Sequence, residues 1–126
     1  MKYLVDSDFL ISFSNPDDSN HKKSHEIYKN MSKDDELIAL NLVFQESTTV
    51  VSKRFGMQKA KDFYGMLIKF IVTKINIDEE IEKNAWKIFL KQTQKGTSFI
   101  DCANQAVFEK LKLDGILSFD EFYRKD

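Results

Sequence analysis

The chain has 126 residues, a formal net charge of −1 and 42% hydrophobic residues, including 11 Phe but only 4 Gly and 1 Pro. This composition is typical of one folded domain over residues 1–126, and it excludes a disordered or low-complexity chain and one with a membrane span of ~20 apolar residues. The balanced charge lacks the basic excess of many nucleic-acid-binding proteins, so any such binding must be local.

The first half of the chain alternates short apolar runs with helical patterns. The expected elements are a strand at 3–5, a helix at 9–13, a helix from Asn20 to about Met31, a strand at 36–40, a helix from Leu42 to Gly56 and a helix opening at Met57. Gly56 suits a left-handed cap at the end of its helix. The helix from Met57 has one apolar face that we expect to be buried, at Ala60, Phe63, Tyr64, Leu67 and Ile71.

The second half continues the alternation. The expected elements are a strand at 74–77, a helix whose first turn carries Asp78, Glu79 and Glu80, a helix from Ser98 to about Lys112 and a strand at 115–119. We expect the second of these helices to bury Ile100, Ala103, Val107 and Leu111. Strands separated by helices form right-handed crossovers and parallel sheets. The sequence therefore predicts a three-layer α/β/α domain with a short, mainly parallel, four-stranded sheet.

Four carboxylates, Asp6, Glu46, Asp101 and Asp120, stand beside apolar runs without an evident basic partner. Asp6 closes the first strand and Asp120 the last, while Glu46 and Asp101 lie in helical patterns. If the first and last strands are neighbours, the four acids can meet in the crevice at the carboxyl ends of the strands. Four like charges raise one another's pKa values unless a cation neutralises them, and oxygen ligands without His or Cys favour Mg²⁺ or Mn²⁺.

Helix capping is an alternative for three of these acids. Asp6 can cap the helix that follows it. Two pairs have the spacing of a capping box, Ser98 with Asp101 and Ser118 with Glu121. In the second pair Asp120 would lie next to the capping residues without being one of them. Glu46 is harder to explain in this way, because its neighbours three and four residues away are apolar or uncharged. For the three aspartates, capping and convergence remain open at this point.

Two further polar groups have ordinary explanations. His21 and His25 are four residues apart but have no third ligand nearby, so we interpret them as surface residues of a helix. Basic side chains cluster around a helix junction, at Lys53, Arg54, Lys59 and Lys61. They are able to hold phosphates, although for each of them taken alone a solvated surface side chain is the favoured explanation.

Four segments carry the acids in a recognisable order and spacing: Leu4–Ile11, Asn41–Ser47, Ser98–Ala103 and Ile116–Phe122. They resemble the corresponding segments of PIN domains, in particular the small VapC-type toxins of toxin–antitoxin pairs. The resemblance implies a metal cluster of Asp6, Glu46, Asp101 and Asp120, with Ser7 and Ser118 as supporting hydroxyls. Asp8 stands where the family often has a neutral residue, and the fifth edge strand common in the family is not expected here.

The resemblance also implies a function. It predicts a Mg²⁺- or Mn²⁺-dependent endoribonuclease of the cytoplasm, acting on RNA as the toxin of a type II pair, with a cognate antitoxin protein as partner and a homodimer as the default assembly. One alternative is a haloacid-dehalogenase-type phosphatase, because Asp6-Ser7-Asp8 resembles its Asp-x-Asp loop. Another is a PIN-like RNA-binding module whose acids only cap helices.

Overall fold

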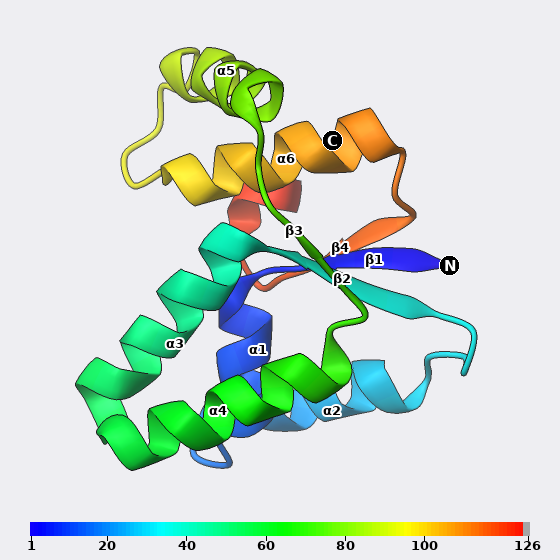
Figure 1. Cartoon of the computed structure of the whole chain (residues 1–126), viewed down its shortest axis with the longest axis vertical. Helices are drawn as coiled ribbons and strands as arrows, with labels where there is room; N and C mark the ends of the chain where they lie inside the picture. The colour runs from blue at the N-terminus through cyan, green and yellow to red at the C-terminus, as the bar shows by residue number, and fades with distance from the viewer. Residues whose placement is uncertain (125–126) are drawn as a thin grey trace.

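A four-stranded parallel sheet lies at the centre of the protein in the computed structural model, which describes residues 1–124 (Figure 1). The elements are β1 (Lys2–Val5), α1 (Ser7–Ser14), α2 (His21–Lys29), β2 (Glu36–Leu40), α3 (Asn41–Phe55), α4 (Met57–Phe70), β3 (Thr73–Ile75), α5 (Glu79–Leu90), α6 (Phe99–Leu111), β4 (Gly115–Leu117) and the 3-10 helix η1 (Glu121–Arg124). The predicted α/β fold with four strands is confirmed.

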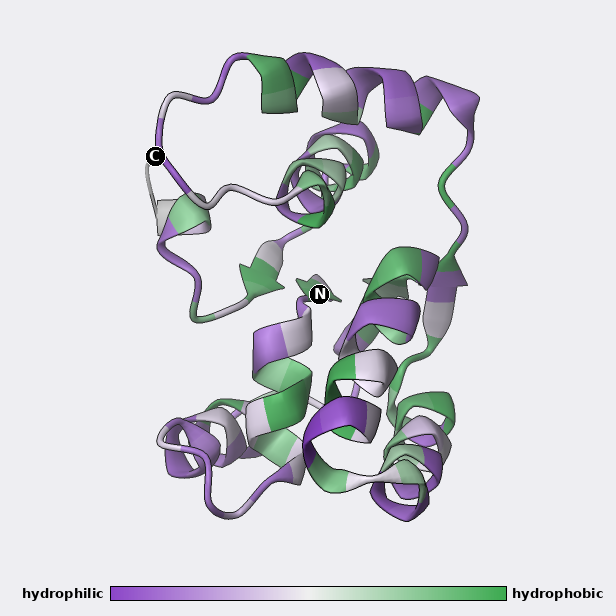
Figure 2. Ribbon diagram, turned by 90° about the vertical axis from the view of Figure 1, so that its left-hand side faces the viewer, coloured by the Kyte–Doolittle hydropathy of each residue, from purple (hydrophilic) through white to green (hydrophobic). Residues whose placement is uncertain are grey.

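Helices cover both faces of the sheet. The helices α1 to α4 lie on one face and α5 and α6 on the other, and Figure 2 shows the strands between the two layers. The central strands β1 and β2 are buried on both faces because they are covered twice, and Leu4, Val5, Ala39 and Leu40 are fully inaccessible to solvent. The outer strands are less buried, and Thr73 and Lys74 of β3 are exposed. None of the helices within residues 1–124 is long and apolar enough to cross a bilayer.

The strand order is β3-β2-β1-β4, so β1 pairs with both the second and the last strand of the chain. Leu4 lies opposite Ile38 on one side and opposite Ile116 on the other. The first and last strands are therefore neighbours, which is the condition under which the acids at their ends can meet. The direction of strand addition reverses between β1 and β4, and in open α/β sheets ligands bind at the carboxyl ends of strands beside such a reversal.

The last two strands are shorter than predicted because side chains take over their ladder positions. The strand predicted at 115–119 ends at Leu117. Two residues later the Phe119 amide donates to the Asp8 carboxylate rather than to a neighbouring strand. The strand predicted at 74–77 runs over Thr73–Ile75, and the Ile77 amide donates to Asn41 Oδ1. Its partner β2 ends where α3 begins, so no strand remains for residue 77 to pair with.

Three predictions about individual positions were wrong. Tyr64 and Leu111, both predicted to be buried, are 49% and 47% exposed. Periodicity identifies the face of a helix that packs inward, but not where the neighbouring element stops covering it. Gly56 does have a positive φ of 89°, but its ψ of 170° is extended rather than left-handed helical, which lets α4 begin directly at residue 57.

The two histidines connect α2 to the end of α1. His21 Nδ1 lies 2.8 Å from the Ser12 carbonyl oxygen, and His25 Nε2 lies 2.8 Å from that of Phe13. These carbonyls belong to the last turn of α1, where backbone acceptors lack partners within the helix. The His25 ring also stacks on Phe13 with 4.1 Å between centroids. Both histidines lie on the surface of α2 as expected, with His25 exposed and His21 partly buried, and both also contact the last turn of α1.

Candidate metal centre

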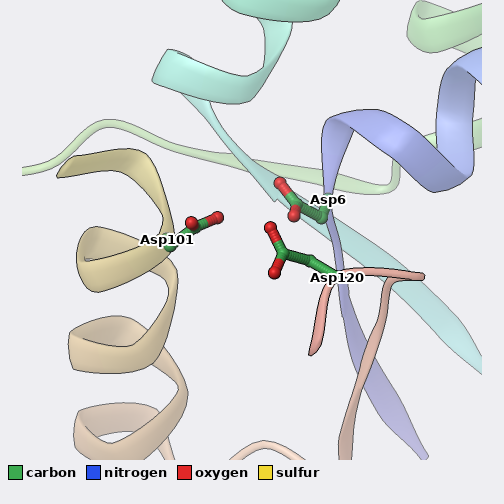
Figure 3. Close-up of side chains that lie close together, drawn as sticks. All are labelled: Asp6, Asp101 and Asp120. Carbon is green, nitrogen blue, oxygen red and sulfur yellow. The ribbon is translucent and has the colours of Figure 1, made fainter. Parts of the chain in front are cut away.

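Three of the four predicted acids converge at the carboxyl edge of the sheet (Figure 3). Asp6 follows β1 and begins α1, Asp101 lies in the first turn of α6, and Asp120 lies between β4 and η1. One carboxylate oxygen of each lies within 4.8 Å of the others. Asp6 and Asp101 are only 5% and 6% exposed, and Asp120 is half-buried. This edge adjoins the reversal in strand order between β1 and β4.

Each of the three aspartates also caps a backbone segment. Asp6 Oδ1 accepts from the Ser7 amide at 2.8 Å, Asp101 forms a reciprocal capping box with Ser98, and Asp120 Oδ1 accepts from the Phe122 amide at 2.8 Å. Capping and convergence are therefore compatible, because a carboxylate has two oxygens and several acceptor directions. The capping bonds fix the orientation of each group.

The predicted capping pair of Ser118 with Glu121 does not form. Ser118 Oγ accepts from the Asp120 amide at 3.0 Å, one residue short of the predicted spacing. The same hydroxyl lies 3.2 Å from Asp6 Oδ2 and 3.2 Å from Asp8 Oδ1. Ser118 therefore connects the end of β4 to the acids at the end of β1.

Glu46 lies in the same cavity but outside the close group of three aspartates. The cavity has a volume of about 520 Å³, and Asp6, Glu46, Asp101 and Asp120 all contribute to its walls. Glu46 Oε1 accepts a short hydrogen bond of 2.5 Å from Ser7 Oγ. Ser7 thus links Glu46, on α3, to the start of α1.

Asp8 takes part in the site, although its role was left open by the sequence. Its carboxylate accepts from the Phe119 amide at 3.1 Å and contacts the Ser118 hydroxyl, and it lines the acidic cavity. It therefore holds the loop that carries Asp120. The only local signal was a second acid two residues after Asp6, in the first turn of α1.

A buried amide and a phenol complete the site, and sequence reasoning missed both. Asn104 is fully buried, and its Nδ2 lies 3.2 Å from Asp6 Oδ1 and 3.0 Å from Tyr123 Oη. Tyr123 Oη in turn lies 3.4 Å from Asp101 Oδ1. Asn104 follows Asp101 by one helical turn, which could have suggested a shared face. Tyr123 gave no local signal, because only η1 brings it to this point.

Burial and mutual repulsion disfavour the charged forms of these acids. Burial raises the pKa of Asp6 from 3.8 to about 7, and the charges of Asp8, Asp101 and Glu46 act in the same direction against a hydrogen bond from Ser7. Burial also raises the pKa of Asp8 and of Asp101, with a further contribution from the charge of Asp120. The ion pairs in the described part of the chain, Met1 with Asp35 and Lys110 with Glu80, involve none of these five acids.

The donor set fits a small divalent cation. The three converging groups are all carboxylates, which suits Mg²⁺ or Mn²⁺ better than metals that prefer imidazole or thiolate. Oxygen ligands at the usual 2.0–2.1 Å from one Mg²⁺ lie at most about 4.2 Å apart, so a spread within 4.8 Å needs only small side-chain adjustments. Arg54 lines the same cavity but forms no ion pair with these acids within residues 1–124, so a cation would supply the positive charge closest to them.

Comparison with known families and curated proteins gives consistent matches. The family model described as PIN domain matches residues 3–125. The 23S rRNA-specific endonuclease VapC20 of Mycobacterium tuberculosis, from strains CDC 1551 / Oshkosh and ATCC 25618 / H37Rv, is 23% identical over 117 residues. The aligned region covers 93% of this chain and 88% of that relative.

Solved structures match over nearly the whole chain. The crystal structure of Mycobacterium tuberculosis VapC20, described as a Sarcin-Ricin loop cleaving toxin, has a TM-score of 0.86 at 20% identity, covering 97% of this chain and 92% of that one. The structure of VapBC2 from Rickettsia felis bound to a DNA fragment from their promoter has a TM-score of 0.70 at 13% identity, with coverages of 98% and 92%. At these identities the structural matches establish the fold.

Proposed function

Because this chain belongs to the PIN domain family, we propose that it is a metal-dependent endoribonuclease that hydrolyses RNA phosphodiester bonds. The observation that carries this proposal is the meeting of Asp6, Asp101 and Asp120, with carboxylate oxygens within 4.8 Å of one another. Glu46 is the fourth proposed site residue, since it lines the same cavity. The dehalogenase-type alternative loses its support, because the family match accounts for the chain from residue 3 to residue 125.

The proposed division of labour follows from the contacts. Asp6, Asp101 and Asp120 would hold Mg²⁺ or Mn²⁺, with Glu46 on the cavity wall. When bound, such an ion activates water and stabilises the oxyanions of an in-line phosphodiester displacement. Ser7 orients Glu46 through its 2.5 Å hydrogen bond. Ser118 and Asp8 hold the Asp120 loop, while Asn104 and Tyr123 orient Asp6 and Asp101. No protein nucleophile is needed.

The proposed biological setting is a toxin–antitoxin pair in the cytoplasm. VapC20 is named as acting on 23S rRNA, and VapBC2 is named as a complex bound to promoter DNA. By analogy we propose structured rRNA as the first substrate class to test and a small cognate antitoxin as the partner. A homodimer remains the default assembly, and sedimentation in solution decides it.

The enzymatic proposal is tested with a panel of structured and single-stranded RNAs that includes a sarcin–ricin stem-loop. We expect cleavage with Mg²⁺ or Mn²⁺, loss of cleavage with EDTA, and a loss of about 100-fold or more in Asp101→Asn. Asp34→Asn, a change to an exposed loop carboxylate, is the matched control. Cleavage that survives both EDTA and Asp101→Asn contradicts the metal mechanism. Manganese binding without cleavage of any RNA identifies a binding module instead.

The toxin assignment is tested by expression in cells. Wild-type chain should slow growth, Asp101→Asn should not, and co-expression of the protein encoded by the adjacent reading frame should restore growth. Normal growth at high levels of cleavage-competent protein identifies a housekeeping nuclease.

A further inference from the structure

A second hollow lies beyond the carboxyl ends of β2 and β3, on the same edge of the sheet as the metal centre. We call it the β3 hollow; it has a volume of about 410 Å³ and is lined by residues including Asn41, Phe44, Gln45, Tyr64, Lys74 and Asn76. Asn41 directly follows β2 and Asn76 directly follows β3, and these two strands are parallel neighbours. Its volume lies in the range of about 300–1,000 Å³ that is usual for small-ligand sites.

The β3 hollow exposes an aromatic ring in a fixed position. Tyr64 belongs to the otherwise buried face of α4 but is 49% exposed. Its ring packs edge-on against buried Phe44, with 6.5 Å between centroids and 74° between planes. Lys74 Nζ lies 5.7 Å from the centroid of the same Phe44 ring, which places a cation beside the aromatic pair. An exposed ring with a neighbouring cation is the combination on which single-stranded nucleic acids stack.

Amide side chains give the β3 hollow hydrogen-bonding capacity. Asn41 is held in place because its Oδ1 accepts from the Ile77 amide at 3.2 Å. The exposed amides of Gln45 and Asn76 have no hydrogen-bond partner among residues 1–124, and neither does the buried Oγ1 of Thr48 in the wall. Side-chain amides offer a donor and an acceptor together, which is the pattern that matches the edge of a nucleobase.

The β3 hollow and the acidic cavity are connected around α3. Gln45 and Thr49 line both the β3 hollow and a shallow groove beside it, and Glu46 and Val50 line both that groove and the acidic cavity. Each of the three depressions has one basic side chain in its wall, Lys74 in the hollow, Lys53 in the groove and Arg54 in the cavity. An RNA strand that crosses α3 from the β3 hollow to the acidic cavity would span a helix diameter of about 10–12 Å and would meet a cation in each depression.

From these observations, and resting on the proposed function, we propose that the β3 hollow binds an unpaired nucleobase of the RNA strand whose backbone is cleaved at the metal centre. Tyr64 stacks on the base, the Asn41, Gln45 and Asn76 amides contact its edge, and Lys74 binds the adjoining phosphate. A base inside a duplex cannot enter such a hollow, because its edges are paired and its faces are stacked. The substrate class is therefore RNA with an unpaired segment next to the cleaved bond.

The test measures binding separately from cleavage. Fluorescence anisotropy with labelled single-stranded RNA in EDTA compares the whole chain with Tyr64→Ala, Tyr64→Phe and Lys74→Ala. We expect about tenfold weaker binding for Tyr64→Ala and near wild-type binding for Tyr64→Phe, because the phenyl ring keeps the stack. Lys74→Ala should reduce the slope of log K against log salt by about 0.7. Tyr28→Ala, which removes a 38% exposed tyrosine on α2, is the matched control.

Cleavage assays with Mn²⁺ distinguish this proposal from the proposed function. We expect Tyr64→Ala to raise KM while leaving kcat near the wild-type value, since the acidic cavity is unchanged. If RNA is cleaved but neither Tyr64→Ala nor Lys74→Ala alters binding, the hollow is rejected and the nuclease stands. If both variants weaken binding but no RNA is cleaved, the hollow stands and the nuclease is rejected. A Tyr64→Ala effect confined to self-association or to binding of a partner protein also overturns the proposal.

Discussion

Replacing Asp6 by Asn removes a buried charge while preserving the hydrogen bonds around it. Asp6 Oδ1 accepts from the Ser7 amide and from Asn104 Nδ2, and Asp6 Oδ2 lies 3.2 Å from Ser118 Oγ. An Asn side chain can keep its oxygen in the first position and donate from its nitrogen to the Ser118 hydroxyl, which then donates to Asp8. The substitution therefore isolates the free energy of the charge.

The pKa of Asp6 gives the magnitude. Its rise from 3.8 to about 7 is a difference of about three pH units, and at 1.36 kcal/mol each this corresponds to about 4 kcal/mol at pH values above 7. Between these two pKa values the folded state binds more protons than the unfolded state, so the free energy of unfolding should fall as the pH rises. Asp8 and Asp101, whose pKa values are also raised, act in the same direction.

The assay is unfolding by heat and by urea in EDTA, at pH 5.0 and at pH 7.5, for wild type, Asp6→Asn and the surface control Asp34→Asn. We expect wild type to be less stable at the higher pH and Asp6→Asn to remove most of that difference, raising the melting temperature at pH 7.5 by about 10 °C. The exposed Met1–Asp35 pair should not contribute to this pH dependence. The pKa of the Met1 amino group is raised above 8.0 and the pKa of the Asp35 carboxyl is lowered below 3.8, so both lie outside the range tested. Wild-type stability that rises with pH, or an Asp6→Asn protein less stable than wild type at pH 7.5, would refute the reasoning.

Two further predictions concern the groups around Asp6. Asp120→Asn keeps an oxygen that accepts from the Phe122 amide, so the metal-free protein should melt at the wild-type temperature or above it. In a thermal titration with Mn²⁺, the additional stabilisation by the metal should be smaller than in wild type. An undiminished Mn²⁺ effect excludes Asp120 from the site. Tyr123→Phe removes the hydroxyl beside Asn104 and Asp101 and should weaken Mn²⁺ binding by 10- to 100-fold in calorimetry, while Tyr3→Phe, whose hydroxyl contacts Met1, should leave it unchanged.

The parts of the site that follow from local rules could be predicted from the sequence. A carboxylate directly after a buried strand must lie at the carboxyl edge of the sheet, which placed Asp6. The same reasoning placed Asp120 at this edge, although β4 ends at Leu117 and a short loop carries Asp120. The capping box of Ser98 with Asp101 depends only on spacing along one helix, and it is present. The pairing of β1 with β4 was a condition for the acids to share one crevice, and only the structure shows that pairing.

The remaining parts depend on distances between elements that a sequence pattern does not contain. Asp8 contacts a loop 110 residues later in the chain, and Tyr123 reaches the site only because η1 turns back toward α6. Glu46 lines the same cavity as the three aspartates, but the sequence pattern does not determine how far its side chain lies from them. The exposure of Tyr64 was missed for a related reason, since coverage by a neighbouring helix is a property of the packed molecule.

The pairing of β1 with β4 also determines when during protein synthesis the site can form. Asp6 is made first, and at ribosomal rates of about 5–20 residues per second Asp120 follows about 6 to 23 seconds later. During that interval one edge of apolar β1 has no partner strand, which is the type of edge that promotes aggregation. A chain still being translated therefore carries no complete acidic cluster until Asp120 has been added.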